Sequence, residues 1–92
     1  MSVLVRFTPS SSTSTQQYDE TIRRLEGEGN WPPDGLEYHC CFISDGNVRV
    51  SEVWDSRAQL EAFGQRLMPV LEAVGIDPGQ PEIVDVHNVV KR

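Results

Sequence analysis

Two runs of mixed hydrophobic and polar residues flank the dipeptide Asp45-Gly46 near the middle of the chain. An Asp-Gly pair in this setting is a strong hairpin signal, because a two-residue type I′ turn needs positive φ at both central residues. The pattern therefore predicts two antiparallel strands, over residues 36–44 and 47–55. A turn this tight also fixes the register, so it indicates which side chains of the two strands share a face.

A short amphipathic helix is predicted before this hairpin. Thr13, followed three residues later by Gln16, fits a capping box at its start. Hydrophobic side chains then recur at the spacing of one helical face, at Tyr18, Ile22 and Leu25. We expect this face to pack against the sheet.

A longer helix is predicted after the hairpin. Ser56 and Gln59 form a second capping box, and Gly75 supplies the stop. Between them, hydrophobic residues follow the helical period at Leu60, Phe63, Leu67, Leu71 and Val74. Pro69 lies inside this helix and removes one backbone hydrogen bond, so we expect a bend or break near Met68.

Two further strands complete the pattern, over residues 3–8 and 82–90. The resulting order, βαββαβ, predicts an α+β, ferredoxin-like fold with four antiparallel strands and both helices on one face of the sheet. The first and last strands of the sequence carry hydrophobic residues on both faces. In a sheet with one face open to water, hydrophobic and polar residues should alternate along each strand. We therefore predict a homodimer in which two sheets pack face to face as a dimeric α/β barrel.

Length and charge narrow the function classes. The 92 residues form a single domain, 1–92, and a chain this short buries only roughly 60–65% of its unfolded surface, so a partner subunit would add stability. The net charge is -6 and the basic residues are scattered, which argues against a nucleic-acid surface. No hydrophobic run approaches the ~20 residues of a membrane span, and the N-terminus lacks a signal-peptide pattern. We expect a soluble, unprocessed, cytoplasmic protein without a membrane partner.

Two adjacent cysteines, Cys40 and Cys41, lie in the predicted second strand. Their side chains point to opposite faces, so we expect no disulfide between them and interpret both as small buried hydrophobic residues. Neither has a second Cys or a His at the spacing of a structural zinc site on a loop. The sequence therefore predicts no metal site and no cofactor.

One acid–base pair follows from the predicted hairpin. With a two-residue turn, His39 lies opposite Glu52 and Glu37 lies opposite Trp54, while Cys41 shares the face of His39. A facing carboxylate favours imidazolium and holds the ring in one tautomer, which is how a general base is oriented. The alternatives are a structural ion pair between His39 and Glu52, and a Trp54 that only fills the core.

At this point the chain resembles the dimeric α/β barrel superfamily, particularly the small antibiotic-biosynthesis-monooxygenase-like proteins. The resemblance covers nearly the whole chain and rests on the element order, on residues 50–56, on Phe63, and on residues 67–69 and 86–88. It implies an aromatic, phenol-like ligand between sheet and helices, deprotonated without metal or flavin, with Trp54 in the wall of the site. The haem-degrading branch uses a histidine on the second helix, and residues 56–74 contain none.

Three function classes remain open. The first is a homodimer that binds an apolar or aromatic small molecule, with His39 and Glu52 as catalytic pair if it is a cofactor-free monooxygenase or isomerase. Its ligand contacts are predicted at Trp54, Cys41, Phe63 and His87, and the alternative for His87 is a polar residue at a strand end. The second is a non-catalytic structural or stress-related dimer whose pocket is filled by its own side chains. The third is a protein-interaction adaptor using residues 31–33. A pocket of ~300 Å³ or more would favour the first.

Overall fold

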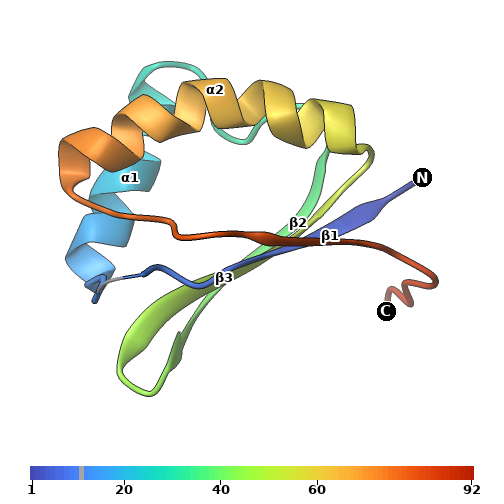
Figure 1. The fold of residues 1–92 in the computed structure, drawn as a ribbon. Helices are drawn as coiled ribbons and strands as arrows, with labels where there is room; N and C mark the ends of the chain where they lie inside the picture. The colour runs from blue at the N-terminus through green and yellow to red at the C-terminus, as the bar shows by residue number, and fades with distance from the viewer. Residues whose placement is uncertain (11) are drawn as a thin grey trace.

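The computed structural model describes residues 1–10 and 12–92, and its element order is the predicted βαββαβ. The elements are β1 (Val3–Phe7), α1 (Thr15–Gly27), β2 (Leu36–Ser44), β3 (Asn47–Trp54), α2 (Arg57–Val74) and β4 (Glu82–Asp85). The strands form one antiparallel sheet in the order β2-β3-β1-β4. Both helices lie on the same side of this sheet (Figure 1), which confirms the ferredoxin-like fold.

The β2–β3 hairpin has the predicted tight turn. Asp45 has φ 53° and Gly46 has φ 78°, so both central residues are in the positive region that a type I′ turn requires. The register that follows pairs Ser44 with Asn47 and His39 with Glu52. The turn chemistry and the central part of the register are therefore confirmed.

An irregularity in β2 overturns the predicted register at the far end of the hairpin. Leu36, and not Glu37, lies opposite Trp54, and the register shifts between Leu36 and Tyr38. This shift places Leu36 against the core, while the carboxylate of Glu37 accepts a hydrogen bond of 2.8 Å from the hydroxyl of Ser2. The irregularity thus buries the hydrophobic side chain and leaves the charged one with polar partners, which is a common use of an extra residue in a strand.

The N-terminus of α1 lies one residue later than predicted. Ser14 is the N-cap: its hydroxyl accepts from the amide of Gln17 at 3.1 Å, and the Gln17 side chain accepts from the Ser14 amide at 2.9 Å. The predicted box of Thr13 and Gln16 is wrong because Thr13 is buried and its carbonyl accepts from the amide of Val48 on β3. Ser14, the next residue along the chain, has a hydroxyl group and serves as the N-cap instead.

Helix α2 begins and ends as predicted, with Ser56 as N-cap and Gly75, at φ 82°, at its C-terminus. The helix continues through Pro69 without a break, and the other predicted outcome, a bend near Met68, stays a prediction. Pro69 and Gln65, whose carbonyl loses its helical partner, both lie on the exposed side of the helix, where water can satisfy that carbonyl. Neither α1 nor α2, the helices of the described residues, is long and apolar enough to cross a membrane.

Strand β4 is shorter than predicted, ending at Asp85 instead of continuing to residue 90. Its neighbour β1 pairs Val3 with Asp85, and the amide of Val86 still donates to the carbonyl of Ser2 at 3.0 Å. The residues after Asp85 belong to no strand in the structure.

The hydrophobic core lies between the sheet and the helices. Its buried members come from both layers: Val3, Val5, Leu25, Trp54, Leu60, Phe63 and Val70. The opposite face of the sheet carries no helix (Figure 1), and Tyr38, Phe42 and Val84 on it are exposed. A sheet face that is open to water normally carries mostly polar side chains.

Candidate functional site

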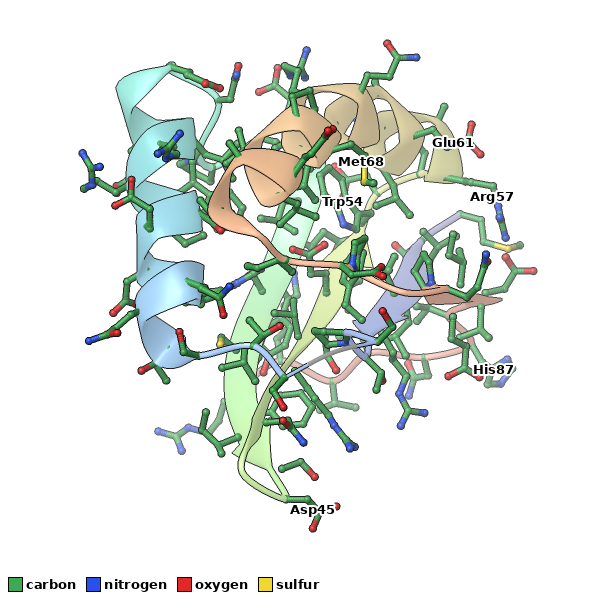
Figure 2. The ribbon with its side chains drawn as sticks, turned by 60° about the vertical axis from the view of Figure 1, so that its left-hand side comes forward. Asp45, Trp54, Arg57, Glu61, Met68 and His87 are labelled. Atoms are coloured by element: carbon green, nitrogen blue, oxygen red, sulfur yellow. The ribbon has the colours of Figure 1, made fainter. Side chains whose placement is uncertain are left out.

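A chain of hydrogen bonds links three elements beneath the helices. The indole Nε1 of Trp54 donates to Oε1 of Glu52 at 3.0 Å, and Oε2 of Glu52 lies 2.6 Å from Nδ1 of His39. Nε2 of His39 lies 2.6 Å from the hydroxyl oxygen of Tyr18 on α1. Strand pairing brings His39 and Glu52 together, and the inward face of α1 adds Tyr18. Figure 2 shows Trp54 between the sheet and α2.

The partners fix the direction of each hydrogen bond. An ionised carboxylate only accepts, and an indole N–H only donates. Nδ1 of His39 therefore carries a proton and donates it toward Glu52. In neutral His39 the lone pair is then on Nε2, where it accepts from the hydroxyl of Tyr18. Glu52 thus orients the imidazole in the way that a base-orienting carboxylate does.

The environment keeps the Tyr18 phenol protonated. Burial raises the pKa of Tyr18 to about 12, and the electrostatic effects of Cys41 and Glu52 act in the same direction. Burial also raises the pKa of the Cys41 thiol. Tyr18 is therefore a hydrogen-bond donor at neutral pH, which agrees with its position beside Nε2 of His39.

A cavity of about 80 Å³ adjoins this network. Its wall includes Tyr18, His39 and Glu52, and the rest is mostly hydrophobic: Phe7, Thr21, Ile22, Leu25, Trp31, Val50, Phe63, Leu67, Leu71 and Pro78. The volume is well below the ~300 Å³ typical of small-molecule pockets. The chain's own aromatic rings take up much of the space between the layers, which accounts for the small volume.

Trp31, in the connector between α1 and β2, places its ring against the hydrogen-bond network. Its centroid lies 4.9 Å from that of His39 in an edge-to-face arrangement, and 6.1 Å from that of Phe63. Phe63 in turn lies 5.6 Å from Trp54. The contacts join Trp31 to the same aromatic cluster as Trp54, and such pairs contribute beyond their buried area.

The structure brings together four of the six predicted site residues. His39 and Glu52 are bonded, Trp54 is bonded to Glu52, and Phe63 packs on Trp54 and lines the cavity. Cys41 is half-buried on the same strand as His39 but does not line the cavity.

The sixth predicted residue, His87, is exposed in the C-terminal stretch, and Figure 2 shows it well apart from Trp54. The proposed roles of all six residues remain predictions. Within the described part of the chain, no three His, Cys, Asp or Glu side chains come together in a group that could hold a metal ion.

The sequence pattern does not place Tyr18 or Trp31 in the site. Tyr18 belongs to the predicted inward stripe of α1, with Ile22 and Leu25, and it is the member of that stripe with a polar tip. That tip is a usable signal, since an inward phenol needs a partner. The partner itself depends on how α1 docks over β2, which no local pattern specifies.

Neither protein-family models nor curated protein sequences match the chain, but solved structures do. SnoaB from Streptomyces nogalater, described as a cofactor-independent oxygenase, has a TM-score of 0.60 at 13% identity, covering 99% of this chain and 96% of its own. Rv0793 from Mycobacterium tuberculosis has a TM-score of 0.61 at 17% identity, covering 98% and 97%. A Deinococcus radiodurans protein, provisionally named an antibiotic biosynthesis monooxygenase, has a TM-score of 0.62 at 10% identity, covering 100% and 98%. The chain therefore has the ferredoxin-like fold of antibiotic-biosynthesis-monooxygenase-like proteins.

Proposed function

We propose that this protein binds a small, flat, apolar or aromatic molecule between its sheet and helices, and that His39 acts on that molecule as a general base. The observation that supports this most directly is the buried pair of His39 and Glu52 at the wall of a mostly hydrophobic cavity. Placing a carboxylate and an imidazole in a core is costly unless both are bonded, so such pairs are often kept for chemistry. The fold shared with SnoaB, described as a cofactor-independent oxygenase, is in keeping with this proposal.

The roles follow from the geometry. Glu52 holds the imidazole of His39 in the tautomer whose Nε2 can take a proton, and it stabilises the imidazolium that results. The indole of Trp54 keeps Glu52 in place and supports Phe63, which lines the cavity, from behind. An aromatic ligand needs more room than about 80 Å³, because an engineered cavity of ~150 Å³ is what binds benzene. Binding therefore requires Trp31 to move aside.

A thermal-shift screen tests the proposal, using polycyclic phenols, quinones, lactones and fatty acids as probes. A ligand at roughly 100 times its dissociation constant stabilises a protein by about 2.7 kcal/mol, which raises the melting temperature by several degrees in a domain of this size. We expect such a rise with a phenol or quinone, and a smaller one in His39→Ala.

His87→Ala is the matched control, because it removes an exposed histidine outside the cavity. It should respond to ligand as the wild type does. Oxygen uptake with the ligands that bind then tests for oxygenation. A screen in which no class of probe raises the melting temperature would contradict the proposal.

The small cavity favours a second candidate, a non-catalytic dimer whose pocket is filled by its own rings. In such a protein Trp31 contributes only packing against His39 and Phe63. Trp31→Ala would then lower the melting temperature, and none of the probes would restore it. Under the first proposal the same substitution enlarges the pocket, so the probes that bind the wild type should bind the variant at least as well.

We also propose that the protein is a homodimer. The uncovered face of the sheet exposes Tyr38, Phe42 and Val84, which is more hydrophobic surface than a solvated sheet face usually carries. Packing two such faces together would bury it and stabilise a chain of only 92 residues.

A further inference from the structure

We propose that Tyr18 is the residue that meets the ligand's reacting group, so that the proton of a ligand hydroxyl reaches His39 through the Tyr18 hydroxyl. This inference rests on the proposed function, and it names an additional catalytic residue. It follows from counting the free donor and acceptor positions in the network.

His39 offers a ligand no free nitrogen. Nδ1 is bonded to Glu52 and Nε2 to Tyr18, each at 2.6 Å, and only 15% of the side chain is exposed. Each oxygen of Glu52 already has a partner, and the single N–H of Trp54 is used by Glu52. A ligand in the cavity therefore cannot reach the base directly without breaking one of these hydrogen bonds.

Tyr18 differs from His39 and Trp54, because its hydroxyl has an acceptor position to spare. A phenol has one proton and two lone pairs, and the proton goes to Nε2 of His39. Among the residues that the structure describes, none donates to the Tyr18 oxygen. Tyr18 is half-buried and lines the cavity. Each Glu52 oxygen also has a second lone pair, but Glu52 is only 4% exposed, so the oxygen of the half-buried Tyr18 is the acceptor of the network that a ligand can reach.

The proton transfer balances without any further reactant. The O–H bond of the ligand breaks, its electron pair stays on the ligand oxygen, and the proton forms a new bond to the Tyr18 oxygen. The original Tyr18 proton moves to Nε2 of His39. The products are a ligand phenolate or enolate and an imidazolium whose charge is compensated by Glu52.

The surroundings of Tyr18 favour a relay over a resting tyrosinate. Four groups around Tyr18 disfavour a negative charge on it: Asp19 on α1, Cys40 and Cys41 on β2, and Glu52 on β3. Together with burial they raise the pKa of Tyr18 to about 12. A tyrosinate would therefore be poorly stabilised, so Tyr18 must pass its own proton to His39 as it receives another.

The test uses 4-nitrophenol, whose phenolate is coloured, and nitrobenzene, which has the same ring and no hydroxyl. In the wild type we expect bound 4-nitrophenol to ionise at a lower pH than free 4-nitrophenol, as read from its absorbance. In Tyr18→Phe we expect this shift to disappear and the affinity for 4-nitrophenol to fall about tenfold, the effect of one hydrogen bond to a charged group. Nitrobenzene should bind both proteins alike.

Tyr38→Phe is the matched control, because it removes a hydroxyl from the uncovered face and leaves the cavity intact. It should behave as the wild type with both probes. Tyr18→Leu is a second variant without the hydroxyl, for use if the phenylalanine variant does not fold, and nitrobenzene binding reports whether the cavity is preserved.

Two results would overturn the inference in different ways. If Tyr18→Phe leaves the ionisation and affinity of bound 4-nitrophenol unchanged, the relay is wrong and His39 takes the proton directly, with the proposed function intact. If neither probe binds the wild-type protein, both the relay and the proposed aromatic site are wrong.

Discussion

The indole Nε1–H of Trp54 donates to Oε1 of Glu52 over 3.0 Å, and both side chains are buried, with 0% and 4% of each residue exposed. A carboxylate in a core is tolerated only when its oxygens are hydrogen-bonded. Trp54 therefore satisfies one oxygen of Glu52 while His39 satisfies the other. The indole is part of the acid–base network and packs against Phe63, which lines the cavity, but Trp54 itself does not line the cavity.

Trp54→Phe should lower the free energy of unfolding by about 2–4 kcal/mol. The variant leaves one oxygen of Glu52 without a donor, which costs roughly 1–3 kcal/mol, and a smaller ring in a buried site adds a packing loss. Urea denaturation followed by circular dichroism measures the difference.

Trp31→Phe provides the comparison for that measurement. The Trp31 indole is half-buried and makes no hydrogen bond within residues 1–10 and 12–92, so only ring contacts are reduced. We expect this change to cost about 1 kcal/mol or less. Equal losses in the two variants would show that the Nε1–H of Trp54 contributes nothing to stability.

The hairpin shows what local sequence could predict. Asp45-Gly46 requires one turn type, and that turn sets the register that places His39 opposite Glu52. The register failed only at Glu37, because the choice between burying Leu36 and continuing the ladder depends on the core that β2 meets. Strand alternation alone contains no information about that core.

The contact between Tyr18 and His39 could not be predicted from the sequence for a similar reason. Tyr18 and His39 are 21 positions apart on different layers, and their contact depends on how far α1 lies above β2. The inward stripe of α1 predicted the direction of Tyr18 but not its partner. The end of β4 likewise depends on its pairing with β1, in which Asp85 lies opposite Val3.

Tyr18 should make stability fall at alkaline pH. Its pKa is raised from 10.0 to about 12 in the folded protein, so the unfolded chain loses this proton at lower pH than the folded chain does. The contribution is fully present below about pH 10 and is lost as pH rises toward about 12. The free energy of unfolding should therefore decrease across that window, as measured by urea denaturation at several pH values.

The chain has 2 tyrosines, and the pKa of Tyr38 is also raised. The measurement is therefore made in the Tyr38→Phe variant, in which Tyr18 is the remaining tyrosine. Adding Tyr18→Phe should flatten the alkaline part of the curve. If the curves of the single and double variants run parallel between about pH 10 and pH 12, Tyr18 is not the group responsible.

Gly35→Ala should destabilise the protein more than Gly46→Ala does, by at least about 1 kcal/mol. Both glycines have positive φ, 90° and 78°, so alanine is strained at either. At Gly35 a Cβ would also lie 2.5 Å from Cδ of Gln59, whereas nothing lies within 4 Å at Gly46. Urea midpoints give the comparison.

The side chain of Gln59 identifies the source of the extra loss. Its Oε1 lies 3.0 Å from the hydroxyl of Ser56, the N-cap of α2, so displacing it disturbs the start of that helix. Gln59→Ala should recover part of the loss in the Gly35→Ala background. No recovery would mean that backbone strain alone accounts for the difference.

Phe42→Glu should convert the proposed homodimer into a monomer. Phe42 is 39% exposed on the uncovered face of the sheet, and in a two-fold interface a charge there would be buried twice, once from each subunit. Met68→Glu is the control: Met68 is 51% exposed, but it lies on α2, on the opposite side of the sheet (Figure 2). Light scattering during gel filtration should report a dimer for the wild type and for Met68→Glu, and a monomer for Phe42→Glu. A monomeric wild type would show that a single chain tolerates this hydrophobic face in water, and the homodimer proposal would be wrong.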